Sequence, residues 1–98
     1  MPLIVVSRSK DTIKISGHAG YAENGKDIVC SAVSALVQTL IMSVKELTDD
    51  VINYDIQPGA AYIKFWSLSE LSRALVGSFL IGIRMIADEY PGNVCIYE

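Results

Sequence analysis

The chain has 98 residues and a net charge of −3, with 51% hydrophobic and only 19% charged residues. This length is typical of one domain with one core, here residues 1–98, and the acidic balance argues against a nucleic-acid-binding protein, which normally carries a basic face. The longest uncharged run, Ile28 to Val44, is too short and too polar for a membrane span. We therefore expect no membrane contact and attribute the apolar excess to surface buried between the subunits of a homodimer.

The first half of the chain predicts a β-hairpin, a loop and a long helix. Residues 3–7 form a β-branched run, and residues 12–16 alternate between apolar and polar side chains, as half-buried strands do. A glycine-containing loop follows from Ala19 to Lys26. Asp27 is then a typical N-cap, and apolar residues at three-four spacing predict a helix from there to about Leu47.

The second half predicts another hairpin, with strands at residues 51–56 and 61–66 around a Pro-Gly turn. We assign the two aromatic residues that end it, Phe65 and Trp66, to the core. After a second helix, a last strand follows at residues 93–97. The order ββαββαβ predicts an α+β fold, a sandwich in which a mostly antiparallel sheet is packed with two helices.

The second helix has a recognisable start and an unusual apolar character. A capping-box pattern places Ser67 at its start, with Glu70 three residues further on, and a Pro-Gly pair ends it. Its apolar residues lie on more than one face, which is typical of a helix buried on two sides. We expect one face to cover the sheet and the remainder, including some of Val76, Leu80 and Met85, to form the homodimer interface.

The candidate catalytic residues are His18, the only histidine, and Cys30. Cys30 is the third residue of the predicted first helix, where unpaired backbone N–H groups and the helix dipole favour the thiolate. A neutral imidazole can take the thiol proton and later protonate a leaving amine. Alone, Cys30 is typical of a buried small side chain and His18 of a loop histidine. Their positions on either side of one loop predict a nucleophile and its base.

Four further residues are candidates for supporting or substrate-binding roles. Gly20 and Gly25 give the loop conformational freedom, which a mobile lid over a peptide groove requires. Asp27 caps the helix and has a possible second role in orienting His18. Ser34 lies one turn after Cys30 on the same helical face, where it either allows close packing or hydrogen bonds near the thiol or the substrate.

Other kinds of site find little support. One histidine and two distant cysteines do not make a zinc site, and the chain has neither a P-loop nor a dinucleotide glycine pattern, so we expect no metal and no cofactor. Cys95 alternates with apolar residues in the last strand, which indicates a structural role. We see no secretory signal and expect a cytoplasmic protein with free thiols.

The motif that contains both candidates resembles the ribosomal-processing cysteine protease family, Prp. It comprises Gly17-His18-Ala19 and then Gly25-Lys26-Asp27-Ile28-Val29-Cys30-Ser31-Ala32-Val33-Ser34. The resemblance covers essentially the whole chain. It implies a dimeric cysteine endopeptidase that removes a short N-terminal extension from a large-subunit ribosomal protein, and also acts on phage proteins, after an apolar, phenylalanine-containing motif. Its catalytic pair matches His18 and Cys30.

The implied reaction is acyl transfer through a thioester, with the oxyanion held by backbone N–H groups that we place at the start of the helix. Two other functions stay open. A thiol-redox protein would use Cys30, although a Cys-x-x-Cys motif is absent. A non-catalytic ribosome-assembly or RNA-binding module would need clustered basic residues and exposed aromatic residues, whereas Lys10, Lys14, Lys26 and Lys64 are scattered along the sequence.

Overall fold

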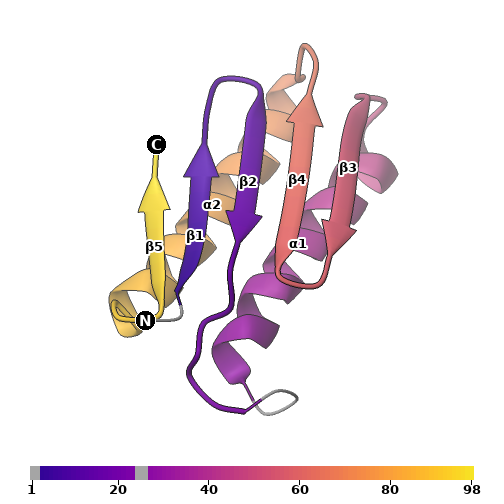
Figure 1. The fold of residues 1–98 in the computed structure, drawn as a ribbon. Coiled ribbons are helices and arrows are strands. Elements are labelled where there is room, and N and C mark those ends of the chain that lie inside the picture. The colour runs from indigo at the N-terminus through magenta and orange to yellow at the C-terminus, as the bar shows by residue number, and fades with distance from the viewer. Residues whose placement is uncertain (1–2, 24–26) are drawn as a thin grey trace.

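The computed structural model describes residues 3–23 and 27–98. Its elements follow the predicted order ββαββαβ (Figure 1). They are β1 (Ile4–Arg8), β2 (Thr12–Ser16), α1 (Ile28–Leu47), β3 (Ile52–Gln57), β4 (Ala60–Phe65), α2 (Glu70–Glu89) and β5 (Val94–Tyr97).

The five strands form one sheet in the order β3-β4-β2-β1-β5. Three neighbouring pairs are antiparallel, and the register of the two hairpins places Val6 opposite Ile15 and Ile63 opposite Tyr54. β5 returns after α2 to lie parallel to β1 at the edge of the sheet (Figure 1). The prediction of an α+β fold with a mostly antiparallel sheet is therefore confirmed.

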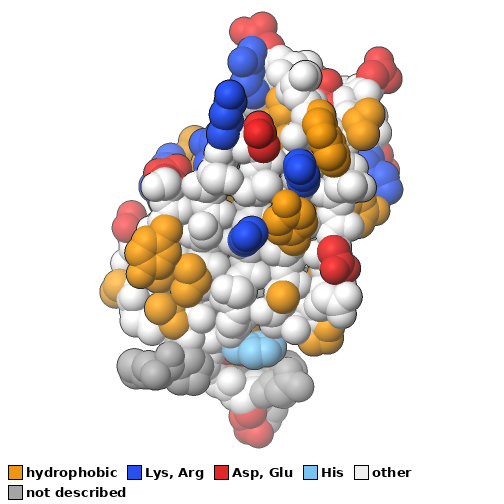
Figure 2. All heavy atoms as spheres, turned by 45° about the horizontal axis from the view of Figure 1, so that its top comes forward, with side chains coloured by type: hydrophobic (Ala, Val, Ile, Leu, Met, Phe, Trp, Pro, Cys, Tyr) orange, Lys and Arg blue, Asp and Glu red, His pale blue; other side chains and the backbone are white. Residues whose placement is uncertain are grey.

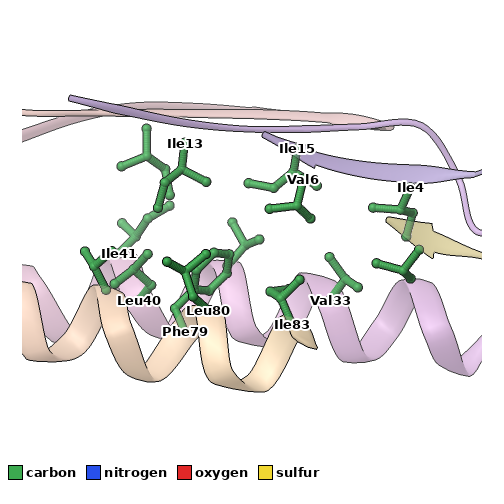
Figure 3. Close-up of a cluster of buried hydrophobic side chains, with 14 of the residues drawn as sticks. Ile4, Val6, Ile13, Ile15, Val33, Leu40, Ile41, Phe79, Leu80 and Ile83 are labelled. Carbon is green, nitrogen blue, oxygen red and sulfur yellow. The ribbon is translucent and has the colours of Figure 1, made fainter. Parts of the chain in front are cut away.

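Both helices pack on the same face of the sheet, and the core lies between these two layers (Figures 1 and 3). Strand residues alternate in burial, so that Ile13 and Ile15 of β2 point toward the helices while Lys14 points away. In the close-up they face Leu40 of α1 and Phe79 of α2. Burial of these apolar side chains is the main force that holds the helices on the sheet.

The predicted start of α1 is confirmed, whereas that of α2 is shifted by two residues. Asp27 caps α1 with its side chain. The N-cap of α2 is Ser69, not Ser67, and its hydroxyl accepts a hydrogen bond from the Ser72 N–H at 3.3 Å. The Asp50 carboxylate fixes Ser69 by accepting from both its N–H at 2.8 Å and its hydroxyl at 2.6 Å. This contact between distant segments selects the later serine as the cap.

The exposed apolar face of α2 differs from the predicted one. Val76 and Leu80 are buried in the core, so they do not contribute to a surface patch, whereas Met85 is 68% exposed as expected. Leu71 and Ile81 join Met85 on the exposed face. α1 is long and apolar enough to cross a membrane by length and composition, a test that core helices also pass, and six of its residues are buried.

On the open face of the sheet, basic side chains lie beside hydrophobic ones (Figure 2). The ammonium of Lys14 lies 5.8 Å from the centre of the Tyr62 ring on the neighbouring strand, and that of Lys64 lies 5.4 Å from the centre of the Trp66 ring. The assignment of Trp66 to the core is wrong, because Phe65 takes the inward position and leaves Trp66 45% exposed. Lys14 and Lys64, which are distant in sequence, thus lie on neighbouring strands.

Candidate active site

A pocket of about 450 Å³ lies between the end of β2, the first half of α1 and the β3–β4 turn. Its walls include His18 and Cys30, which come from opposite sides of the loop that joins β2 to α1. Ser34 lines the same pocket one turn further along α1. The structure therefore brings together three of the residues that the sequence singled out.

Cys30 is held at the start of α1 by contacts on its backbone and its sulfur. Its N–H donates to Asp27 Oδ1 at 2.9 Å, which is part of the helix cap. Its Sγ accepts a hydrogen bond from the backbone N–H of Ala19 at 3.2 Å, across the loop. An N–H donor stabilises a thiolate more than a thiol, because the charged sulfur is the stronger acceptor. These contacts thus fix the position of the sulfur at the start of α1.

The Asp27 carboxylate connects the β2–α1 loop to the start of α1 through hydrogen bonds. Its Oδ2 accepts from the Tyr21 N–H at 3.0 Å, while Oδ1 accepts from Val29 and Cys30. Burial raises the pKa of the Asp27 carboxyl, but N–H donors, above all that of Cys30, outweigh burial and leave the pKa below its usual value. Within the described part of the chain, Asp27 makes no hydrogen bond to His18. The structure thus gives Asp27 a capping role and not the suggested contact with the imidazole.

Three backbone N–H groups in the first turn of α1 already donate to Asp27. The N–H groups of Val29 and Cys30 donate to the Asp27 side chain, and the Ser31 N–H donates to the Asp27 carbonyl at 3.1 Å. These three N–H groups already have acceptors. They therefore do not form the oxyanion hole that we expected at the start of the helix. The Ala19 N–H is a backbone donor that points at the sulfur itself.

His18 is exposed at the rim of the pocket, and its position depends on two glycines. Gly17 adopts φ +94°, and a Cβ on it would lie 2.1 Å from the Leu3 carbonyl oxygen, so only glycine fits. The Gly17 N–H donates to the Gly59 carbonyl at 2.9 Å. The imidazole then lies against Gly59, where a Cβ would come within 2.8 Å of His18 Nε2.

The imidazole and the thiol share a pocket without a direct bond between them. His18 and Cys30 are both described, and the structure places no hydrogen bond between these two side chains. Catalytic hydrogen bonds are often long in a free enzyme and tighten when substrate binds. The arrangement suits a base that engages the thiol or the substrate during reaction.

Gln38 is a pocket residue that sequence reasoning missed. Its Nε2 donates to the Ser34 hydroxyl at 2.9 Å, and both side chains line the pocket. Cys30, Ser34 and Gln38 are spaced four residues apart and thus lie along one face of α1. The four-residue spacing was therefore a signal in the sequence from which Gln38 could have been predicted to lie near Cys30. No comparable local signal pointed to Gly59, which reaches the pocket only through the sheet pairing of β4 with β2.

The remaining candidates lie outside the pocket wall or outside the described residues. Gly20 is exposed with φ +65° and does not line the pocket. Gly25 falls within residues 24–26, which the structure does not describe, so its role and the predicted lid stay predictions. Cys95 is a half-buried free cysteine on β5 and is not part of the pocket wall. Residues 3–23 and 27–98 hold no cluster of three potential metal ligands.

Comparisons with known proteins agree on one family. Residues 4–95 match the model of the family described as cysteine protease Prp. A ribosomal processing cysteine protease Prp of Staphylococcus aureus is 29% identical over 83 residues, which cover 82% of this chain and 78% of that protein. The Prp of Mycoplasma genitalium is 28% identical over 98 residues, covering 98% and 96% of the two chains.

A solved structure of a Prp protease has the same fold as this chain. A crystal structure of the essential ribosomal processing protease Prp from S. aureus, with a covalently linked product peptide, superposes with a TM-score of 0.88 at 20% identity. The match covers 99% of this chain and 98% of that one. Because the family model spans nearly the whole sequence, this chain belongs to the Prp family of cysteine proteases.

Proposed function

We propose that this protease removes an N-terminal extension from a large-subunit ribosomal protein, with Cys30 as the nucleophile and His18 as the general base. The observation that carries the assignment is that one pocket is lined by both side chains. The names of the relatives, which are ribosomal processing proteases, support the substrate class. Phage proteins are a second substrate class for the same site.

The chemistry is acyl transfer. The Cys30 thiol gives its proton to His18, and the sulfur attacks the scissile carbonyl carbon to form a C–S bond, while the carbonyl oxygen becomes an oxyanion. The Ala19 N–H, which donates to the sulfur in the free enzyme, is our candidate for an oxyanion donor. Protonated His18 gives its proton to the leaving amine as the C–N bond breaks. Water then loses a proton to His18 and attacks the thioester. The C–S bond breaks and releases the new carboxyl terminus, and His18 returns the proton to the sulfur.

The lining of the pocket supports a substrate that has an apolar residue near the cleavage site. Its walls are mostly aliphatic, and these side chains come from both layers: Ile4, Ile15, Val33, Val37, Ile56 and Ala61. Ser34 and Gln38 form one polar strip on the α1 wall. A pocket of this kind accepts a large apolar side chain and leaves the polar strip for peptide groups of the substrate.

The direct test is incubation of the enzyme with the extended ribosomal protein and with a peptide that spans the junction, followed by mass spectrometry of the products. We expect one cut at the junction, and none with Cys30→Ala. A junction peptide whose apolar residues are replaced by serine should remain intact. An uncut extended protein and an uncut peptide would reject the proposed substrate.

The open sheet face bears on the RNA-binding alternative. Its two lysine–aromatic pairs place ammonium groups over the rings of Tyr62 and Trp66. The chain's own lysines thus cover ring surface that stacking on bases would require. Retention of RNA by a Cys30→Ala variant that cleaves nothing would favour that alternative, whereas thiol exchange without cleavage would favour a redox protein.

The same proposal includes a cytoplasmic homodimer built on α2. Leu71, Ile81 and Met85 are 48%, 54% and 68% exposed, respectively. With Ala74 and Ser78 they follow an alternating three-four spacing, and all five are exposed along one stripe of the helix. A two-fold partner would cover this stripe on both subunits at once.

A further inference from the structure

Asn93 lies in the turn between α2 and β5, far in sequence from the pocket, yet it contacts the loop that follows His18. Its Nδ2 donates to the Ala19 carbonyl at 2.8 Å, across 74 residues of sequence. The backbone of Asn93 is itself fixed on two sides. Its N–H donates to the Tyr90 carbonyl at 2.9 Å, and its carbonyl accepts from the Ile4 N–H at 2.9 Å. The side-chain amide therefore extends from a rigid part of the fold.

Ala19 is the residue through which this contact reaches the site. It is fully buried, its carbonyl accepts from Asn93, and its N–H donates to Cys30 Sγ at 3.2 Å. Ala19 also follows His18 directly in the chain. One residue thus connects the asparagine, the sulfur and the backbone that carries the imidazole.

A second contact joins the same segments. The rings of Tyr21 and Tyr90 meet edge to face, with centroids 5.2 Å apart and planes at 77°. Such pairs add to the attraction that burial provides. The loop between His18 and Tyr21 is therefore attached to the end of α2 at two points, in addition to its bond to Asp27.

We propose that Asn93 is a positioning residue of the active site, which holds Ala19 so that its N–H points at the Cys30 sulfur and so that His18 stays at the pocket. Its side chain acts through Ala19, and Asn93 itself does not line the pocket. This inference rests on the proposed roles of Cys30 and His18. Without the amide, the Ala19 carbonyl loses its partner, and the N–H is free to turn away from the sulfur.

The experiment compares Asn93→Ala and Asn93→Asp, each made in a Cys95→Ser background so that Cys30 is the one thiol. Asn93→Asp keeps the size of the side chain but presents a carboxylate, which cannot donate to the Ala19 carbonyl. We expect kcat on the junction peptide to fall roughly 10- to 100-fold in both variants, with little change in KM, as misplaced catalytic groups produce. Alkylation of Cys30 by iodoacetamide should change in rate, because the sulfur loses its fixed N–H partner.

Ser69→Ala is the matched control. It removes the N-cap of α2, on the other end of that helix, and should lower the urea midpoint while leaving kcat and the alkylation rate unchanged. The alkylation readout needs no ribosomal substrate. If the native enzyme does not cut the junction peptide but the Asn93 variants alter the alkylation rate, this inference stands and the proposed substrate is rejected. A normal kcat and a normal alkylation rate in folded Asn93→Asp, or the same changes in Ser69→Ala, would overturn the inference.

Discussion

The imidazole of His18 lies against the backbone of Gly59, so closely that a Cβ at position 59 would come within 2.8 Å of Nε2. Gly59 adopts φ +75° in the turn that joins β3 to β4, and its carbonyl accepts from the Gly17 N–H next to His18. The second hairpin therefore forms a support for the ring. This relationship makes Gly59 a position where one methyl group should affect catalysis.

For Gly59→Ala, we expect a fall in kcat/KM of roughly 10- to 100-fold, because the new Cβ displaces the imidazole. The positive φ also costs an alanine about 1–2 kcal/mol of stability. Asparagine tolerates this backbone conformation better, so Gly59→Asn should lose activity to a similar degree with a smaller loss of stability. Peptide-cleavage kinetics and urea unfolding measure the two effects separately.

Gly77→Ala is the control for the effect of an added methyl group. Gly77 lies within α2, and a Cβ there would meet no atom within 4 Å. We expect this variant to keep full activity and to gain about 1 kcal/mol in stability from improved helix propensity. A Gly59→Asn enzyme with the activity of Gly77→Ala would show that the imidazole does not depend on the turn.

The catalytic assignment makes unequal predictions for the two thiols. Cys30→Ala should abolish cleavage of the junction peptide, and His18→Ala should lower it roughly 100- to 10,000-fold, the range typical of a lost general base. Cys95→Ser should remain active, because Cys95 does not line the pocket. Circular dichroism checks that each variant is folded. Cleavage at the normal rate by Cys30→Ala would refute the nucleophile.

Local pattern was sufficient to predict the order of elements and the start of α1. Asp27 precedes a run of apolar residues at helical spacing, and its side chain caps the helix as that pattern indicates. The pocket shared by His18 and Cys30 also followed from local features, since one loop separates a strand end from a helix start.

The mistaken details depend on contacts between segments that are distant in sequence. Ser67 and Ser69 are both plausible caps, and the Asp50 carboxylate decides between them. Asn93 and Gly59 reach the site through the packing of β5 and the pairing of β4, which no short window of sequence reveals. Sequence reasoning therefore singled out two residues that share the pocket, but not the groups that support them.

The proposed homodimer predicts that charge on the exposed stripe of α2 disrupts association. We expect sedimentation of the native protein at micromolar concentration to show a dimer, and Ile81→Glu to show a monomer, because an unpaired charge at a buried interface is costly. Val51→Glu is the matched control, since Val51 is 68% exposed but lies outside α2. A native protein that sediments as a monomer would contradict the dimer.

The lowered pKa of Asp27 predicts how stability changes in acid. Because the folded-state pKa lies below the usual 3.8, the unfolded chain binds more protons near this pH, and stability rises with pH there. The contribution of the carboxylate is fully present above 3.8 and is lost as the pH falls through the lowered folded value. Asp27→Asn leaves an N–H donor without its acceptor, so it should be about 1 kcal/mol less stable at pH 7. Urea unfolding across the acid range should show the two curves converging, whereas parallel curves would mean that Asp27 is not the titrating group.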